Sequence, residues 1–384
     1  MFATRTNWNL TPNPLAEALA RFRASGRKLL DLTASNPTEC GFQYDGASIL
    51  KALITPAVLK YHPDPRGLEP ARKAVAEYYF QRGDEVPLDD LILTVSTSEA
   101  YSYAFRLLCN PGEEVLVPTP SYPLFDFLAD IQDVKLIRYP LIYDHGWQID
   151  FHALEAAITP RTRAVIVVHP NNPTGHFTKA AEIEKLNSIC TEHGLAVIAD
   201  EVFLDFALAD LRPPSFVRNN SVLTLTMSGI SKISGLPQMK FSWLAVDGPA
   251  ARKRDALARL EVIADTFLSM NAAIQAAAPT LLAQRHGIQR QLLTRVQSNL
   301  AELDRQLSEQ QACSRLEIEG GWYAVLRVPA TRSDEELALE LLEDAVYVHP
   351  GHFYDFPGEG YLVVSLIAPE RDFSEGIEKL LALF

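Results

Sequence analysis

Short apolar segments alternate with segments of helical periodicity from about residue 90 to residue 247, and this alternation constrains the fold more than any other feature. Such alternation is typical of a parallel sheet whose two faces are covered by helices. We therefore expect an α/β fold with a mostly parallel, seven-stranded sheet covered by helices. The strands are expected at residues 91–95, 114–118, 134–139, 164–168, 196–199, 222–226 and 241–246.

Three polar side chains follow successive strands of this predicted sheet. Asn172 lies in a Pro-Asn-Asn-Pro-Thr-Gly turn, Asp200 ends the next strand, and Lys232 follows the one after it among small residues. Singly, these residues are typical of a turn, a helix N-cap and the surface. Ligands of open α/β sheets, however, bind outside the carboxyl ends of the strands. The joint pattern therefore predicts a binding site at this edge of the sheet.

The chemistry of these three groups suits pyridoxal phosphate. A desolvated lysine can lose its proton and attack a carbonyl carbon, so Lys232 would hold the cofactor aldehyde as a Schiff base. Asp200 would keep the pyridine nitrogen protonated, which makes the ring an electron sink. Asn172 would donate a hydrogen bond to the phenolic oxygen of the ring.

At these residues the chain resembles the class I and II aminotransferases, the fold type I group of pyridoxal-phosphate enzymes. The Asn-Asn-Pro-Thr-Gly turn, the Asp-Glu pair that begins at Asp200, and Ser231-Lys232 followed by Gly-Leu-Pro match the main motifs of that family. The resemblance runs from about residue 31 to the C-terminus and places Ser231 beside the cofactor. It implies transfer of an amino group between an amino compound and a 2-oxo acid.

The resemblance assigns further cofactor contacts. Ser96, Thr97 and Ser98 would meet the phosphate at the start of a helix, where backbone amides and the helix dipole favour an anion. The family usually carries a glycine at the position of Ser96, so the turn is altered here. Tyr122 would stack on the pyridine ring. Tyr61 would reach the phosphate of the neighbouring subunit, which implies a homodimer with shared active sites.

Three positions depart from the family pattern. Phe203 replaces a tyrosine, and a phenyl ring cannot donate to the phenolic oxygen, so we expect a raised pKa of the internal imine. Lys240 replaces a phosphate-binding arginine. It supplies a point charge but lacks the planar guanidinium that can form two parallel hydrogen bonds to a phosphate. Val363 replaces the arginine that pairs with the substrate carboxylate. The substrate is therefore expected to be atypical for the family.

The sequence leaves open what takes the place of that arginine. Arg66, Arg138, Arg327 and His352 are conceivable substitutes, although each is typical of a solvated or structural residue. Asn36 falls in a segment that lines the substrate site of the family and would offer a hydrogen bond instead of a charge. We hypothesise an unusual amino donor or acceptor.

The rest of the chain indicates a second, smaller unit. Helical segments dominate residues 249–311, and strands are expected at 316–328 and 361–366 with helices at 333–343 and 373–383. This pattern is typical of a small α+β domain. We expect a large cofactor-binding domain at 46–285 and a small C-terminal domain at 286–384. Following the resemblance, an N-terminal arm at 1–45 is expected to pack with the small domain.

Other functions use the same scaffold. The lysine and aspartate pair also supports β-elimination, decarboxylation and racemisation, because function depends on the site and not on the fold. A pyridoxal-phosphate-dependent lyase or decarboxylase is therefore the alternative. A catalytically degenerate cofactor-binding protein is a second alternative.

Composition excludes some partners and favours a location. The net charge of −13 argues against non-specific binding to nucleic acid or to an anionic membrane. The N-terminus lacks an apolar signal core, and no apolar stretch is long enough to span a bilayer. The four cysteines show no metal-ligand spacing, so we expect no metal, buried thiols and a cytoplasmic location. They are Cys40, Cys109, Cys190 and Cys313.

Overall fold

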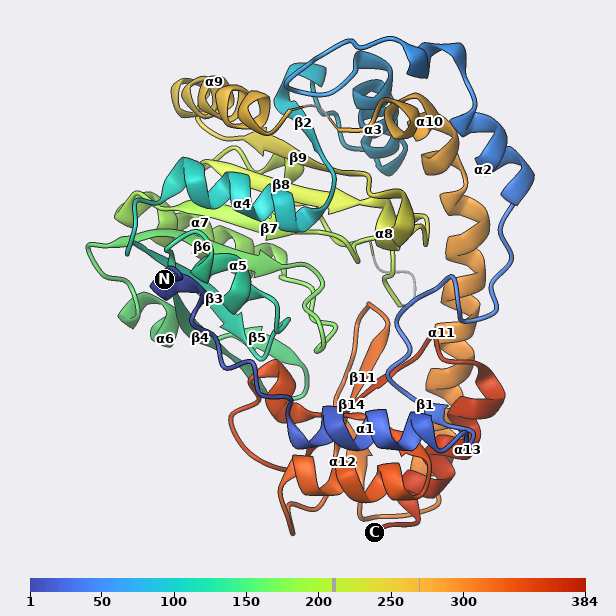
Figure 1. Ribbon diagram of the computed structural model, residues 1–384. Helices are drawn as coiled ribbons and strands as arrows, with labels where there is room; N and C mark the ends of the chain where they lie inside the picture. Colours follow the sequence, from blue (N-terminus) through green and yellow to red (C-terminus); the bar gives the residue numbers. More distant parts are fainter. Residues whose placement is uncertain (209–211, 269) are drawn as a thin grey trace.

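The computed structural model describes residues 1–208, 212–268 and 270–384, and an eight-stranded sheet dominates it (Figure 1). The strand order is β2-β9-β8-β7-β6-β3-β4-β5. Neighbours from β8 to β4 run parallel, whereas β9 is antiparallel to both of its neighbours and β5 is antiparallel to β4. The strands are β2 (Leu91–Thr94), β3 (Glu114–Thr119), β4 (Lys135–Tyr143), β5 (Trp147–Ile149), β6 (Thr162–Val168), β7 (Ala196–Asp200), β8 (Thr224–Gly229) and β9 (Ser242–Asp247).

The predicted α/β fold is confirmed, with one correction to the strand count. Seven strands were expected and the sheet has eight, because β5 pairs with the end of β4 across a tight turn. This strand has only three residues. It is therefore too short to produce an apolar run that distinguishes it from a loop.

Helices cover both faces of the large sheet because its strands send alternate apolar side chains to opposite sides. Ile166 belongs to an apolar cluster that includes residues of α4, α5 and α9, whereas Val165 and Val167 belong to the cluster of the opposite face, which includes residues of α6 and α7. Helices α3 and α10 cover the end of the sheet formed by β2 and β9. Their bounds are α3 (Glu69–Arg82), α4 (Thr97–Leu108), α5 (Phe125–Asp130), α6 (Phe151–Ala156), α7 (Ala180–His193), α9 (Ala250–Phe267) and α10 (Ala272–Ala283).

A smaller sheet of order β10-β11-β14-β13 lies beyond the carboxyl edge of the large one, and α11 runs from one to the other (Figure 1). The N-terminal strand β1 pairs in parallel with β12, and α1 packs on α12. No helix of the described residues is both long enough and apolar enough to cross a bilayer. The remaining elements are α1 (Pro14–Ala24), β1 (Leu30–Asp31), α2 (Gly46–Leu53), α8 (Ile230–Ile233), α11 (Arg285–Leu307), β10 (Ser314–Arg315), β11 (Tyr323–Arg327), α12 (Asp334–Glu343), β12 (Val346–Tyr347), β13 (His349–Pro350), β14 (Tyr361–Ser365) and α13 (Glu370–Leu381).

The strand expected at residues 316–328 is present only in part, as β11. The preceding residues form a loop that hydrogen-bonds to the large part of the molecule. Glu319 N donates to the Gly175 carbonyl at 3.3 Å, and Gly321 N donates to the Phe206 carbonyl at 2.9 Å. A side chain at Gly320 would lie 2.6 Å from the ring of Phe177, so only glycine fits this approach. These long-range contacts outweigh the local strand pattern.

Candidate active site

The residues predicted from the sequence gather at one edge of the large sheet, in the order of the strands they follow. Ser96 follows β2, Lys232 lies in α8 directly after β8, and Asp200 is the last residue of β7. Asn172 follows β6, and Tyr122 follows β3. Because these strands run in the same direction, their carboxyl ends meet at this edge. The topology therefore places five residues that are distant in the sequence along one line.

Lys232 and Asp200 form the charged centre of the site. Burial raises the pKa of Asp200 to about 6, and the positive charge of Lys232 opposes this shift. Burial lowers the pKa of Lys232 to about 8, and the negative charge of Asp200 opposes that shift. A lysine with such a pKa has a neutral form within reach at physiological pH. Neutral nitrogen is the form that attacks a carbonyl carbon.

The Asp200 carboxylate is held in a fixed orientation. Tyr101 Oη donates to Asp200 Oδ2 at 3.1 Å, and Val202 N donates to Oδ1 at the same distance. Tyr101 is buried on α4, one turn after the predicted phosphate-binding residues. The sequence analysis missed Tyr101, because only its position on that helix hinted at a role.

Two aromatic rings lie beside the lysine. Lys232 Nζ lies 5.2 Å from the centroid of the Phe203 ring and 4.9 Å from that of Trp322. The two rings meet edge to face, with centroids 5.1 Å apart. An amine over aromatic faces gains a favourable electrostatic interaction when it is charged. Trp322 belongs to the loop that was expected as a strand, so sequence analysis did not assign it to the site.

Asn172 offers an unsatisfied polar group. Its side chain is buried, and its Oδ1 atom has no hydrogen-bond partner among the residues that the structure describes. The neighbouring Asn171 instead stabilises the turn, because its Oδ1 accepts a hydrogen bond from Thr174 Oγ1 at 3.0 Å. A buried acceptor without a partner is costly, so a group that donates a hydrogen bond to Asn172 Oδ1 would stabilise the site.

The start of α4 presents backbone amides at the same edge. Ser96 is the N-cap, and its Oγ accepts a hydrogen bond from Glu99 N at 3.2 Å. Thr97 and Ser98 are the first two residues of the helix and are half-buried. Their amides have no intrahelical acceptor, and the helix dipole adds partial positive charge. This end of the helix therefore suits an anion.

Lys240 lies near this helix start. It comes just before β9, whose first residue Ser242 pairs with Thr94, the last residue of β2. The Lys240 side chain is exposed, and within the described part of the chain it forms no ion pair. Ser231, which was also predicted to contact the cofactor, is half-buried next to Lys232 in α8.

The two predicted tyrosines differ in their surroundings. Tyr122 is partly exposed and packs edge-on against Phe125, with ring centroids 6.2 Å apart. Its pKa is raised by burial and by the charge of Asp200, so its phenol lies within the field of the site. Tyr61 is 82% exposed in the segment after the 3₁₀ helix Pro56–Leu59. Among the described residues, Tyr61 makes no hydrogen bond or ring contact with Lys232 or Asp200.

The three arginines considered as carboxylate ligands are occupied elsewhere. Arg66 Nε donates to Glu261 Oε2 at 2.9 Å, and Arg138 Nε donates to Asp355 Oδ2 at 2.8 Å. Arg327 stacks on a tyrosine ring at the exposed end of β11. None of the three is among the charges that act on Lys232 or on Asp200.

The remaining residues considered for binding the substrate are either exposed or apolar. Asn36 is exposed, and its Oδ1 accepts a hydrogen bond from Thr38 Oγ1 at 2.8 Å. His352 is exposed in the turn after β13. Val363 is buried in β14, directly opposite Val325 and His349 on the neighbouring strands.

Comparison with known proteins identifies the family. A model of the family described as aminotransferase class I and II matches residues 30–372. The chain belongs to this family. It is accordingly a pyridoxal-phosphate-dependent transaminase that takes an amino donor and a 2-oxo acid.

Individual relatives of this aminotransferase share about a quarter of its residues. Glutamate-pyruvate aminotransferase AlaA of Escherichia coli (strain K12) is 29% identical over 271 residues, which cover 70% of this chain and 67% of AlaA. Alanine aminotransferase of Mycobacterium tuberculosis (strain H37Rv) is 27% identical over 380 residues, which cover 96% of this chain and 88% of that enzyme. The crystal structure of an Escherichia coli aminotransferase has a TM-score of 0.88 at 25% identity, with 100% and 98% of the two chains covered.

The residues present in this aminotransferase fit pyridoxal phosphate. The unpartnered amide of Asn172, the free amides at the start of α4 and the Lys232–Asp200 pair are groups that need a ligand. They supply, in order along the sheet edge, an anion site, an amine, a carboxylate and an amide. These groups would meet a phosphate, an aldehyde carbon, a protonated pyridine nitrogen and, with Asn172 Nδ2 as the donor, a phenolic oxygen on one molecule.

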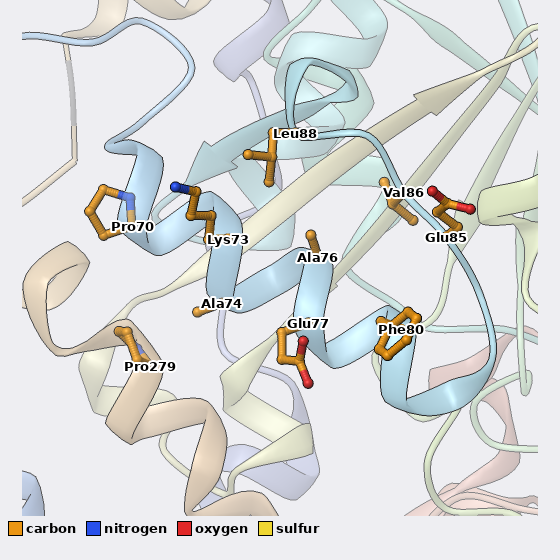
Figure 2. Close-up of a pocket in the computed structure, with 10 residues that line it drawn as sticks. All are labelled: Pro70, Lys73, Ala74, Ala76, Glu77, Phe80, Glu85, Val86, Leu88 and Pro279. Carbon is orange, nitrogen blue, oxygen red and sulfur yellow. The ribbon is translucent and has the colours of Figure 1, made fainter.

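A separate cavity lies on the outer side of α3 in this aminotransferase (Figure 2). Its volume is about 540 Å³, and none of the predicted site residues lines it. Figure 2 shows Lys73, Glu77 and Phe80 on α3, with Pro279 of α10 on the facing wall. This hollow is therefore distinct from the edge of the sheet where the cofactor groups gather.

Proposed function

We propose that the chain transfers the amino group of a compound that is not held by an arginine–carboxylate pair, with a 2-oxo acid as the second substrate. One observation carries this proposal. Val363, which stands where the family carries the arginine that pairs with the substrate carboxylate, is a buried apolar residue of β14. The reacting centre thus has an amine and a carboxylate, whereas the residue at this position offers no charge to a substrate carboxylate, and Arg66 and Arg138 are bonded to other carboxylates.

Asp200 is proposed to act at the ring nitrogen. When bound, pyridoxal phosphate supplies a carbonyl carbon that joins to amines and a ring that accepts electrons. Asp200 would hold a proton on the ring nitrogen, and Tyr101 would keep the carboxylate aimed there through their 3.1 Å hydrogen bond. A buried carboxylate stabilises a positive partner strongly, because little water screens the interaction.

Lys232 is proposed to move the proton during the reaction. Its lowered pKa makes the neutral amine available, and Nζ would take a proton from the carbon that bears the substrate amine. The rings of Phe203 and Trp322 lie beside this nitrogen, with their centroids 5.2 Å and 4.9 Å away. Lys232 would then return the proton to the carbon that had carried the cofactor carbonyl. The proton stays within the site because the surrounding side chains are largely buried.

The phosphate group and the second subunit complete the proposal. Thr97, Ser98 and Lys240 would hold the phosphate, with Ser96 capping the helix that supplies the amides. Tyr61 would contribute from a partner subunit, since its exposed ring follows the exposed apolar residues Ile54 and Leu59 along the chain. Clustered exposed apolar side chains are typical of an interface. We infer a homodimer with shared active sites.

The test is a half-reaction screen on the holoenzyme. The visible band of the lysine-bound cofactor is recorded while amino acids, amines and modified amino acids are added one at a time. We expect the band to disappear with particular amines and to return with a 2-oxo acid. Lys232→Ala should show no such band, whereas the exposed Lys185→Ala should behave as wild type.

Each alternative function predicts a different result in this screen. Release of ammonia or carbon dioxide without any 2-oxo acid would identify a lyase or a decarboxylase and would overturn transamination as the main activity. A stable band that no amine changes would indicate a degenerate cofactor-binding protein. A wild-type enzyme without a band after loading would contradict the assignment of Lys232.

A further inference from the structure

One face of the small sheet is turned toward the active site. Opposed residues of antiparallel strands project to the same face, so His349, Val363 and Val325 share one side of β13, β14 and β11. Tyr323 and Ser365 form another opposed pair, two residues away from Val325 and Val363 on the same strands, and therefore lie on that same side. These residues therefore form a wall built from three strands.

This wall reaches the reacting lysine through aromatic contacts. The Tyr323 ring lies 6.3 Å from the Phe203 ring, whose centroid is 5.2 Å from Lys232 Nζ. The backbone carbonyl of Tyr354, which follows β13, accepts a hydrogen bond from Ser121 N at 2.9 Å. Ser121 directly precedes Tyr122 in the chain. The small sheet and the loop after β3 are thus joined beside the site.

Two side chains of this region form an uncharged pair. His349 Nδ1 and Tyr354 Oη are 3.0 Å apart, which is a hydrogen bond in either tautomer. Burial lowers the pKa of His349 to about 4 and raises the pKa of Tyr354 well above its usual value. Both groups are therefore neutral at physiological pH. Their mutual bond uses one of their two hydrogens and leaves one N–H or O–H donor.

Arg138 lies near this pair, but it is already ion-paired with Asp355, the residue after Tyr354, and with Asp126. The charges that act on Tyr354 and on Tyr323 come from other tyrosines and from Cys40, and the charge that acts on His349 is the carboxylate of Asp31. A substrate carboxylate placed against this wall would lose water without gaining an opposite charge, which is unfavourable. A neutral oxygen would gain a hydrogen bond from the remaining donor.

We propose that His349 and Tyr354 determine substrate specificity, and that they bind a neutral polar group, a hydroxymethyl or a carboxamide, on the carbon that bears the substrate amine. This inference rests on the proposed function, because it requires that an amine reacts at Lys232. It assigns to the substrate a chemistry that matches the wall: an ammonium toward Phe203 and Trp322, and an uncharged oxygen toward Tyr354.

The experiment compares three compounds with one carbon skeleton: alanine, alaninamide and 2-aminopropan-1-ol. The rate of loss of the visible band is measured under single-turnover conditions with wild-type holoenzyme, Tyr354→Phe and His349→Phe. We expect alaninamide and the amino alcohol to react at least about tenfold faster than alanine, the equivalent of one hydrogen bond. Each variant should reduce the ratio of the rate with alaninamide, or with the amino alcohol, to the rate with alanine. A purely structural defect would instead slow the reaction of all three compounds equally.

Val363→Arg gives a second measurement, with Val363→Leu as the uncharged control. The arginine should raise the rate with alanine relative to alaninamide, and the leucine should leave the ratio unchanged. If either variant fails to fold, the wild-type ratio and the Tyr354→Phe ratio still decide the question. Alanine reacting as fast as its two analogues, or ratios that no variant changes, would overturn the inference.

The same experiment separates this inference from the proposed function. An intact band that none of the three compounds changes, but that an amine without a neutral polar group on that carbon removes, would reject the neutral polar group and leave the transaminase assignment in place. A preparation without any band would reject the assignment of Lys232 itself.

Discussion

The phenolic oxygen of Tyr101 lies 3.1 Å from Oδ2 of Asp200, and both side chains are buried. This hydrogen bond connects α4, whose first residues are the proposed phosphate site, to the end of β7, where the ring nitrogen is expected to bind. One pair of connected elements would therefore position the two ends of the cofactor. A shift of α4 would move the carboxylate and the anion site together.

Tyr101→Phe tests this connection. We expect the cofactor to remain bound but the half-reaction to slow by about tenfold, because a buried carboxylate loses a donor worth roughly 1–3 kcal/mol. Single-turnover kinetics and the visible band provide the measurement. Tyr139→Phe is the matched control, since it removes another buried hydroxyl, which donates to the Ile166 carbonyl at 2.7 Å and not to Asp200. Equal losses in both variants would show that Tyr101 acts only through stability.

The sequence was sufficient for the parts of the fold that depend on local pattern. Each expected strand of the large sheet overlaps an observed one, because runs of consecutive apolar residues are needed where both faces are buried. β5 was not predicted, because a three-residue strand carries no such run. The loop before β11 was wrongly predicted as a strand. Its contacts with Gly175 and Phe206 come from segments distant in the sequence, so a local pattern does not reveal them.

The same distinction applies to the site. Lys232, Asp200 and Asn172 were predicted because each follows a strand, and sheet topology alone brings strand ends together. Tyr101 and Trp322 were missed because their positions depend on how a helix and a loop pack across the sheet. Such packing is a property of many residues at once, and no short motif encodes it.

Phe203→Tyr tests the effect of the altered aromatic residue. A hydroxyl at this position would donate to the phenolic oxygen of the cofactor and stabilise the deprotonated imine, so the pKa of the imine should fall. The pH titration of the visible band measures this pKa in wild type and variant. Phe206→Tyr is the control, because Phe206 is also buried against Trp322, at a centroid distance of 5.0 Å, but is not one of the rings that flank Lys232. An unchanged imine pKa in Phe203→Tyr would contradict the proposal that the wild type lacks a hydrogen bond to the phenolic oxygen.

Glu201→Gln tests the pH dependence of stability. Burial raises the pKa of Glu201 from 4.5 to about 7, against hydrogen bonds from Phe216 N and Ser215 Oγ. A raised folded-state pKa stabilises the protein fully below the unfolded-state pKa, and this contribution is lost as the pH rises through about 7. The melting temperature of wild type relative to Glu201→Gln should therefore fall between about pH 5 and pH 8. Thermal denaturation of both proteins across that range measures the difference.

The exposed Glu192→Gln provides the reference for this experiment. All other titrating groups are shared between wild type and each variant, so their contributions cancel in the difference. The difference in melting temperature between wild type and Glu192→Gln should stay constant over the same pH range. Parallel curves for Glu201→Gln as well would reject the raised pKa.

Mixed dimers test whether Tyr61 completes the site of a partner subunit. Tyr61→Phe removes the hydroxyl proposed to reach the partner's cofactor phosphate, and we expect cofactor affinity to fall by about tenfold for one lost hydrogen bond to a charged group. Lys232→Ala should be inactive. At limiting cofactor each variant alone is therefore poor. A dimer with one chain of each kind contains one complete site, formed by Lys232 of the first chain and Tyr61 of the second.

Random exchange of subunits in an equal mixture puts about half of the dimers in the mixed form, so about a quarter of all sites are complete. The activity of the mixture should therefore rise above the mean of the two parent variants as exchange proceeds. The exposed Lys185→Ala mixed with Tyr61→Phe is the reference, because every Lys232 is intact there and exchange should leave the activity at the mean of the parents. If the Lys232→Ala mixture also stays at its mean, while size measurements show dimers that exchange, Tyr61 lies outside the partner's site.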